Sequence, residues 1–187
     1  MTPLNELQQA RLVLTRRHLV LAGALSVGLC GTRSGLADGG SADQVSRSGE
    51  AIHQEPAFHA QRHRIYQALT DAKLFDQLMA LSGAVKSKAV ERKPAQIDPR
   101  PGGAFSLFGD YIQGRFIDLS PDKLIVQAWR VGSWDPGVYS VARFELRDAG
   151  EGSKIVFDHT GFPVGQANHL AEGWYENYWQ PLRELLE

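Results

Sequence analysis

An aromatic, amphipathic stretch at the end of the chain, residues 165–187, limits the possible folds more than any other segment. Its mostly apolar side chains recur at spacings of three and four, which places them on one face of a helix. This face consists of Leu170, Trp174, Asn177, Tyr178, Pro181, Leu182 and Leu185. So wide a stripe needs a broad apolar partner, which the strands expected between residues 94 and 161 can supply. The sequence therefore predicts a long C-terminal helix packed on a sheet.

Five segments before this helix alternate apolar and polar side chains, as half-buried strands do. They span residues 104–109, 112–120, 123–130, 139–147 and 154–160. The connections at residues 121–122 and 149–152 are short turns rich in Pro, Asp and Gly. Strands joined in this way pair antiparallel, because parallel neighbours need a crossover of about a dozen residues or more.

Ahead of these strands, we expect a short first strand at residues 52–58 and two short helices. Pro56 confines the first strand to an edge or a bulge, because proline cannot donate a ladder hydrogen bond. The pattern becomes helical from His59, and Asp71 can cap a second helix that runs through Leu81. The whole order predicts an α+β fold, in which a curved antiparallel sheet of about six to seven strands wraps around the long C-terminal helix.

The first 37 residues have the pattern of an export signal. Arg16 and Arg17 precede an apolar run at residues 19–30, which is too short to span a membrane but suits a signal-peptide core. Residues 15–19 resemble the twin-arginine export motif, and residues 35–37 offer a cleavage site of small residues. We expect a periplasmic or otherwise exported protein without stable membrane insertion after cleavage. The alternative is an uncleaved tail.

Three segments follow from this division: an export signal at residues 1–37, a flexible Ser- and Gly-rich linker at residues 38–50, and a folded domain at residues 51–187. Cys30, the only cysteine, falls in the signal, so the remainder has no thiolate nucleophile or disulfide. Basic side chains outnumber acidic ones within the signal, and residues 38–187 are mildly acidic. Nucleic-acid binding needs a basic stripe, so we expect no nucleic-acid partner.

Several short motifs occur together in the predicted domain. They are Ala68-Leu69-Thr70-Asp71, Gly102-Gly103-Ala104-Phe105, Ile125-Val126-Gln127-Ala128-Trp129-Arg130, Phe144-Glu145-Leu146, His159-Thr160-Gly161-Phe162-Pro163 and Gly173-Trp174. In this order they resemble the family of homologues of the activator of the heat-shock protein 90 ATPase. That family belongs to the START-related, helix-grip (SRPBCC) superfamily. The resemblance covers about residues 52–187 and implies a cavity between the sheet and the last helix.

Aromatic side chains are the candidates for this cavity. The predicted ligand-binding residues are Phe105, Trp129, Phe144, Phe157, His159, Trp174 and Tyr178. Aromatic rings line cavities and also fill cores, so both outcomes stay open. Strand alternation places His159 on the face that meets the helix, where it acts either on a ligand or as a hydrogen-bonded core residue.

Three functions remain open. The first is binding of a small apolar or amphipathic ligand in the cavity, and the second is activation of the heat-shock protein 90 ATPase. Export disfavours a chaperone partner, because that chaperone and its ATP are cytoplasmic. The third is an enzyme of the cyclase or hydrolase kind, with His159 or Asp118 as general base. Since no catalytic motif is present, we expect a binding protein rather than an enzyme.

We also expect no cofactor and no metal site. His59 and His63 are four residues apart on a predicted helix, which is a spacing that metal ligands use. The sequence between them supplies neither a third ligand nor the glutamate of a zinc hydrolase. We therefore interpret both histidines as surface residues.

Overall fold

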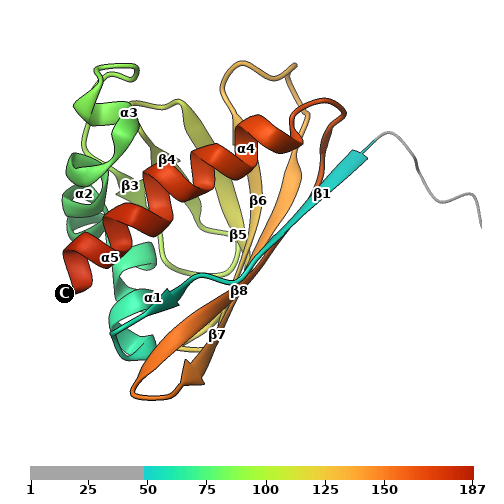
Figure 1. Cartoon of the computed structure of the whole chain (residues 1–187). Coiled ribbons are helices and arrows are strands. Elements are labelled where there is room, and N and C mark those ends of the chain that lie inside the picture. Colours follow the sequence, from blue (N-terminus) through green and yellow to red (C-terminus); the bar gives the residue numbers. More distant parts are fainter. Residues whose placement is uncertain (1–48) are drawn as a thin grey trace, which may run out of the picture. The chain divides into compact units, whose positions relative to one another are not determined.

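The computed structural model describes residues 49–187, which form an α+β unit with a curved antiparallel sheet wrapped around the C-terminal helix (Figure 1). The predicted fold class is confirmed. The predicted export signal at residues 1–37 and the linker up to residue 48 lie outside the described residues. Within residues 49–187, no helix is long and apolar enough to cross a membrane.

Eight strands make up the sheet, in the order β1-β8-β7-β6-β5-β4-β3, with β2 paired to β8. Their bounds are β1 Gly49–Gln54, β2 Ala57–Phe58, β3 Gln96–Ile97, β4 Ala104–Leu107, β5 Ile112–Ser120, β6 Leu124–Val131, β7 Ser140–Ala149 and β8 Gly152–Pro163. All pairs are antiparallel, as the short turns predict. The one expected strand at residues 52–58 is two strands, because Pro56 interrupts it.

Helices follow the first strands and end the chain. Their bounds are α1 Arg62–Thr70, α2 Ala72–Leu81, α3 Gly83–Lys86, α4 Ala167–Trp174, the π-helical turn η1 Tyr175–Trp179 and α5 Gln180–Leu186. The Asp71 carboxylate accepts hydrogen bonds from the N–H groups of Lys73 (2.9 Å) and Leu74 (3.0 Å), which confirms it as the cap of α2. The short helix α3 and the strand β3 were not predicted.

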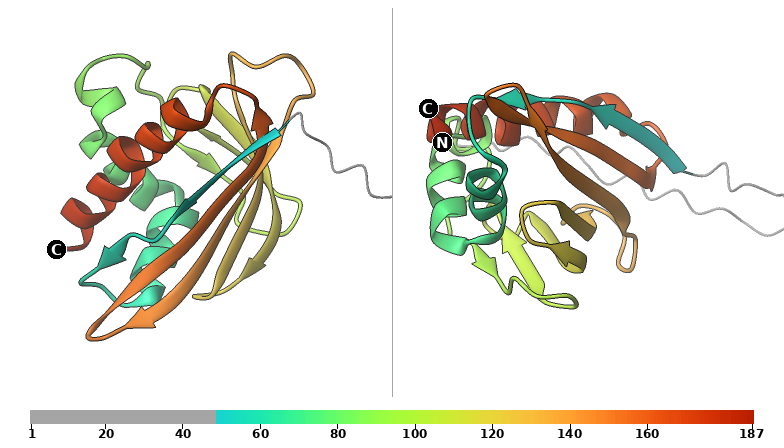
Figure 2. Two further views of the ribbon diagram at one scale, coloured as in Figure 1. Left: turned by 45° about the vertical axis from the view of Figure 1, so that its right-hand side comes forward. Right: turned by 90° about the horizontal axis from the view of Figure 1, so that it is seen from below.

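The segments α4, η1 and α5 form one continuous helix that crosses the concave face of the sheet (Figure 2). The predicted buried face is correct through Leu182, with Asn177 half-buried, and it differs at Trp179 and in the last turn. Trp179 and Leu186 are buried, whereas Leu185 is only half-buried. The wider π turn causes this difference, because it inserts about one extra residue into the helical repeat.

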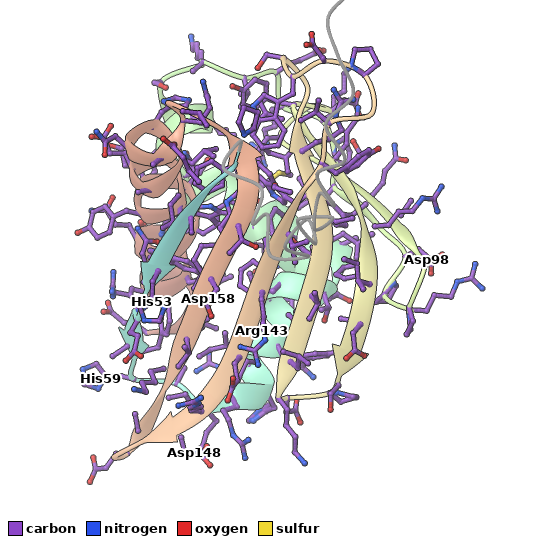
Figure 3. The ribbon with its side chains drawn as sticks, turned by 90° about the vertical axis from the view of Figure 1, so that its right-hand side faces the viewer. His53, His59, Asp98, Arg143, Asp148 and Asp158 are labelled. Atoms are coloured by element: carbon purple, nitrogen blue, oxygen red, sulfur yellow. The ribbon has the colours of Figure 1, made fainter. Side chains whose placement is uncertain are left out.

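The outer face of the sheet carries a row of charged side chains from three neighbouring strands (Figure 3). His53 Nδ1 lies 2.7 Å from Asp158 Oδ1, and Arg143 Nη1 lies 3.9 Å from Asp158 Oδ2. The hydrogen bond to Asp158 raises the pKa of His53 above its ordinary value. This face is therefore solvated, and the core lies on the side of the C-terminal helix.

Candidate functional site

A pocket of about 460 Å³ lies between the C-terminal helix, α3 with the segment after it, and the strands β5 and β6. The sheet side contributes Phe108, Tyr111, Ile112, Trp129 and Val131. The helix contributes His169, Leu170, Gly173, Trp174, Glu176, Asn177 and Tyr178. The third side is formed by α3 and the next residues, which are small or short: Gly83, Ala84, Ser87, Ala89 and Val90. Most of the wall is therefore apolar.

Of the seven predicted ligand-binding residues, three line this pocket: Trp129, Trp174 and Tyr178. The other four, Phe105, Phe144, Phe157 and His159, are buried in the packed core instead. The rings of Phe144 and Phe157 lie 4.9 Å apart between their centroids, and both pack against Trp179. The space between sheet and helix is thus filled near Trp179 and hollow beside α4 and α3.

His159 is fully buried, and both of its ring nitrogens have a hydrogen-bond partner. The Trp174 indole N–H donates to His159 Nδ1 (3.0 Å), so the ring proton is on Nε2, which lies 2.7 Å from Ser140 Oγ. The Ser140 hydroxyl in turn donates to the Trp129 carbonyl (3.0 Å). Burial lowers the pKa of His159 to about 3, so the ring is neutral. The geometry gives His159 a structural role that fixes helix, β7 and β8 together.

Two residues of the pocket wall carry a polar atom that is buried away from solvent and makes no hydrogen bond of ordinary geometry among residues 49–187: Trp129 Nε1 and Tyr178 Oη. Trp129 is 3% exposed and Tyr178 is 5% exposed. Burial raises the pKa of the Tyr178 phenol well above its ordinary value, and a hydrogen-bond interaction with the Trp129 side chain opposes this shift in part. Buried polar groups in native proteins are nearly always paired, and these two interact with each other in the interior behind the pocket wall.

Asn177, in the π turn, joins the helix to α3. Its Oδ1 accepts a hydrogen bond from the Ala84 N–H (2.8 Å), and its Nδ2 donates to the Gly173 carbonyl (3.1 Å). The first bond satisfies an N–H group that the start of α3 leaves without a partner, and Ser82 caps the same turn. Asn177 therefore sets the distance between two walls of the pocket.

The segment after α3 is tied to the body at two points. The Ala95 N–H donates to Asp76 Oδ1 on α2 (2.6 Å). Lys93 Nζ lies 3.1 Å from Asp110 Oδ2 in the turn between β4 and β5. These bonds hold the small residues Ala89 and Val90 at the pocket.

Phe108 belongs to the same turn and has a left-handed backbone, with φ of 52°. This conformation is uncommon for a bulky residue. Its ring is held between Phe75 and Tyr178, at centroid distances of 5.9 and 5.7 Å, and its N–H donates to Met79 Sδ (3.1 Å). Such backbone strain is concentrated at functional sites, and here it presents an aromatic ring to the pocket.

The residues considered for acid–base or metal chemistry lie elsewhere. Asp118 is exposed at an irregularity in β5, and His59 and His63 are exposed as well. The expectation that both histidines share a helix is wrong, because α1 begins only at Arg62. In the described part of the chain, no group of three or more His, Cys, Asp or Glu side chains is placed to hold a metal ion.

Sequence reasoning missed the wall formed by α3 and the residues up to Val90. A local signal for it was present, because Ser82 precedes Val85 by three residues and accepts a hydrogen bond from its N–H (3.3 Å), as an N-cap does. Trp179 was missed for a different reason. A regular helical repeat places it off the buried face, and only the π turn brings it to the sheet.

Curated relatives match part of this chain. An uncharacterized protein of Schizosaccharomyces pombe is 34% identical over 97 residues, and the activator of 90 kDa heat shock protein ATPase homolog 1 of Homo sapiens is 26% identical over 97 residues. Each alignment covers 52% of this chain and 29% of the relative. The chain thus spans less than a third of the length of these relatives.

Solved structures share the fold. An HSP90 activator from Plasmodium falciparum superposes with a TM-score of 0.62 at 22% identity, over 74% of this chain and 96% of the other. CalU16 from Micromonospora echinospora superposes with a TM-score of 0.56 at 17% identity, over 74% of this chain and 76% of the other. At these identities, the likeness concerns the fold.

The family described as activator of Hsp90 ATPase homolog 1-like protein matches residues 59–187, which include α1 and every later element. This range contains all the residues that line the pocket and the buried network around His159. The match covers more than two thirds of the chain, so the chain belongs to the family of activator of Hsp90 ATPase homolog 1-like proteins.

Proposed function

We propose that the domain binds a small apolar or amphipathic molecule in the pocket between α3, the sheet and the C-terminal helix. The pocket itself is the observation that carries this proposal. Its volume of about 460 Å³ and its largely apolar, aromatic wall are typical of small-molecule sites. The few polar side chains in the wall, which include Ser87, His169 and Asn177, are of the kind that orient a ligand in such sites.

Native mass spectrometry of the full chain from its own host, combined with thermal unfolding in the presence of lipids, quinones and aromatic compounds, tests the proposal. We expect a retained small molecule, or a compound that raises the melting temperature. The absence of both would contradict the proposal.

Two leucine variants make the test specific to the pocket. Gly173→Leu places a side chain in the pocket, where a Cβ would meet no atom within 4 Å, and should abolish the stabilisation by the ligand. Gln180→Leu adds the same side chain at an exposed position of the same helix and should preserve it. Equal stabilisation of both variants would place the ligand elsewhere.

A second candidate function is activation of the Hsp90 ATPase. Its support is the family, together with relatives from Homo sapiens and Dictyostelium discoideum that are named as activators of this ATPase. Addition of the purified full chain to Hsp90 from its own host tests it. A concentration-dependent rise in the rate of ATP hydrolysis is expected if the candidate is correct, and an unchanged rate would exclude it.

The two candidate functions need different compartments, because the chaperone and its ATP are cytoplasmic. We propose that the ligand-binding domain acts after export. The support is the twin-arginine-like run at residues 15–19, followed by the apolar segment at residues 19–30. A reporter that is active only outside the cytoplasm, fused after residue 50, should be active. Replacement of Arg16 and Arg17 by lysine should silence it, and activity of both fusions would contradict a twin-arginine route.

A further inference from the structure

The charges in the pocket wall limit the ligands that the pocket can hold. Among the described residues that line it there is no lysine and no arginine, and Glu176 is the one carboxylate. An anionic ligand would lose hydration without gaining a cationic partner, which is unfavourable. The wall therefore disfavours anions and offers one negative charge to a ligand.

The Glu176 carboxylate is not engaged in an ion pair with any of residues 49–187. By contrast, Glu184 on the same helix lies 3.3 Å from Lys86 Nζ of α3. The imidazole of His169, which also lines the pocket, precedes Glu176 by seven residues, or about 10 Å along the helix, and is exposed. A cationic ligand would thus not have to displace a cation of the protein from Glu176.

Two acceptor oxygens lie beside open space at Gly83, on the α3 side of the pocket. A Cβ placed on Gly83 would lie 3.8 Å from Glu176 Oε2 and 3.8 Å from Asn177 Oδ1. Because Gly83 has no side chain, this space is left to a ligand. The Asn177 oxygen accepts one hydrogen bond from the Ala84 N–H and has a second lone pair, and an ionised carboxylate can only accept. A ligand group that donates hydrogen bonds matches both oxygens.

The rest of the wall suits an apolar body. Phe108, Ile112, Val131 and Leu170 contribute apolar side chains, and the volume of about 460 Å³ is within the range of small-molecule sites. In such sites the apolar surface supplies most of the contact area, and a few polar groups fix the orientation of the ligand. The oxygens beside Gly83 can take this second part.

We propose that the pocket binds an amphipathic amine, a small molecule with an apolar body and one ammonium group. The ammonium group lies beside Gly83 and donates hydrogen bonds to Glu176 Oε2 and Asn177 Oδ1, while the body packs against the apolar wall. An ammonium group has three donors and a positive charge, so it satisfies both oxygens and pairs with the carboxylate. This inference rests on the proposed ligand-binding function and adds the chemical class of the ligand.

Three matched probes test the chemistry on the full chain: naphthylethylamine, naphthylethanol and naphthaleneacetate. They share the ring system and nearly the same size, and they differ in carrying a positive charge, no charge or a negative charge. Titration calorimetry should find the amine bound about fivefold more tightly than the alcohol, as expected for a charged hydrogen bond at an exposed carboxylate. The acid should bind most weakly of the three. Salt at about 1 M should reduce the preference for the amine, because it screens exposed charges.

Two glutamate variants complete the test. Glu176→Gln removes the charge at nearly constant size, so the amine and the alcohol should bind almost equally. Glu172→Gln makes the same change at an exposed position of the same helix, outside the pocket, and should leave the preference unchanged. The two variants have the same net charge, so a general effect of protein charge would change both alike.

The outcomes separate this inference from the proposed function. Equal binding of the amine and the alcohol, tightest binding of the acid, or an equal change of preference in both variants overturns the inference, while ligand binding stands. An unchanged preference in Glu176→Gln overturns it as well. If none of the three probes binds and an uncharged lipid does, the amine class is overturned and the pocket remains a binding site. If no compound of any class binds, the proposed function fails too.

Discussion

Replacement of Gly173 by alanine should stabilise the protein. Gly173 lies in α4 with an ordinary helical backbone, and a Cβ placed there would meet no atom within 4 Å. Glycine in a helix interior costs about 0.5–1 kcal/mol relative to alanine, because the unfolded chain has more conformations to lose. No clash offsets this gain. We therefore expect the free energy of unfolding to rise by about 0.5–1 kcal/mol.

The measurement is urea unfolding of the two proteins, followed by circular dichroism and extrapolated with a common slope. Gly150→Ala is the matched control, because a Cβ at Gly150 also meets no atom within 4 Å but the backbone φ is 60°. Alanine in that left-handed conformation costs roughly 1–2 kcal/mol. The two substitutions should therefore change the midpoint in opposite directions.

A fall in stability of Gly173→Ala similar to that of Gly150→Ala would refute the reasoning. It would mean that the π turn that begins at Tyr175 requires glycine at position 173. A higher free energy of unfolding for Gly173→Ala would mean that the natural glycine makes the helix less stable than alanine would, at a residue that lines the pocket. Proteins retain such destabilising residues where function needs them, which here is space for a ligand.

Three further outcomes can be measured. Tyr178→Phe removes a buried hydroxyl that makes no hydrogen bond of ordinary geometry among residues 49–187, so the free energy of unfolding should stay constant or rise by up to about 1 kcal/mol, and a clear fall in denaturant titrations would contradict this. Asn177→Ala removes the bonds to Ala84 and Gly173 and should cost about 1–2 kcal/mol by the same assay, whereas an unchanged midpoint would show that α3 is held by other contacts. The pKa of His159 is about 3 in the fold against an ordinary 6.5, so the unfolded state takes up a proton first as the pH falls. The contribution of His159 to the free energy of unfolding should therefore be fully present above pH ~6.5. Below pH ~6 this free energy should fall by about 1.4 kcal/mol per pH unit. His159→Gln lacks this contribution, so parallel stability curves of the two proteins between pH ~6 and ~5 would contradict the argument.

Local patterns were sufficient for most of the architecture. The two-residue alternation of residues 112–120 predicted β5 with its observed bounds, because a strand with one buried face must alternate. Asp71 predicted the start of α2, because its carboxylate meets the free N–H groups of the first turn. These signals act between residues close in sequence.

Part of the site was also accessible from the sequence. Trp129, Trp174 and Tyr178 were expected at a cavity and do line the pocket. Phe105 was expected there too, but it packs on Phe116 at a centroid distance of 5.3 Å. An aromatic residue that lines a cavity and one that fills a core follow the same strand pattern, so alternation cannot separate them.

The sequence by itself determined that the chain contains an antiparallel sheet and an aromatic helix to cover it, because hydrophobic periodicity is written into neighbouring residues. Only the tertiary structure decided where the space between them is filled. The π turn moves Trp179 into the core against Phe144 and Phe157, and Asn177 ties α3 to the helix through Ala84. Both contacts join residues that are not neighbours in the sequence, and Asn177 and Ala84 are 93 positions apart, so the pocket exists only once the chain has folded.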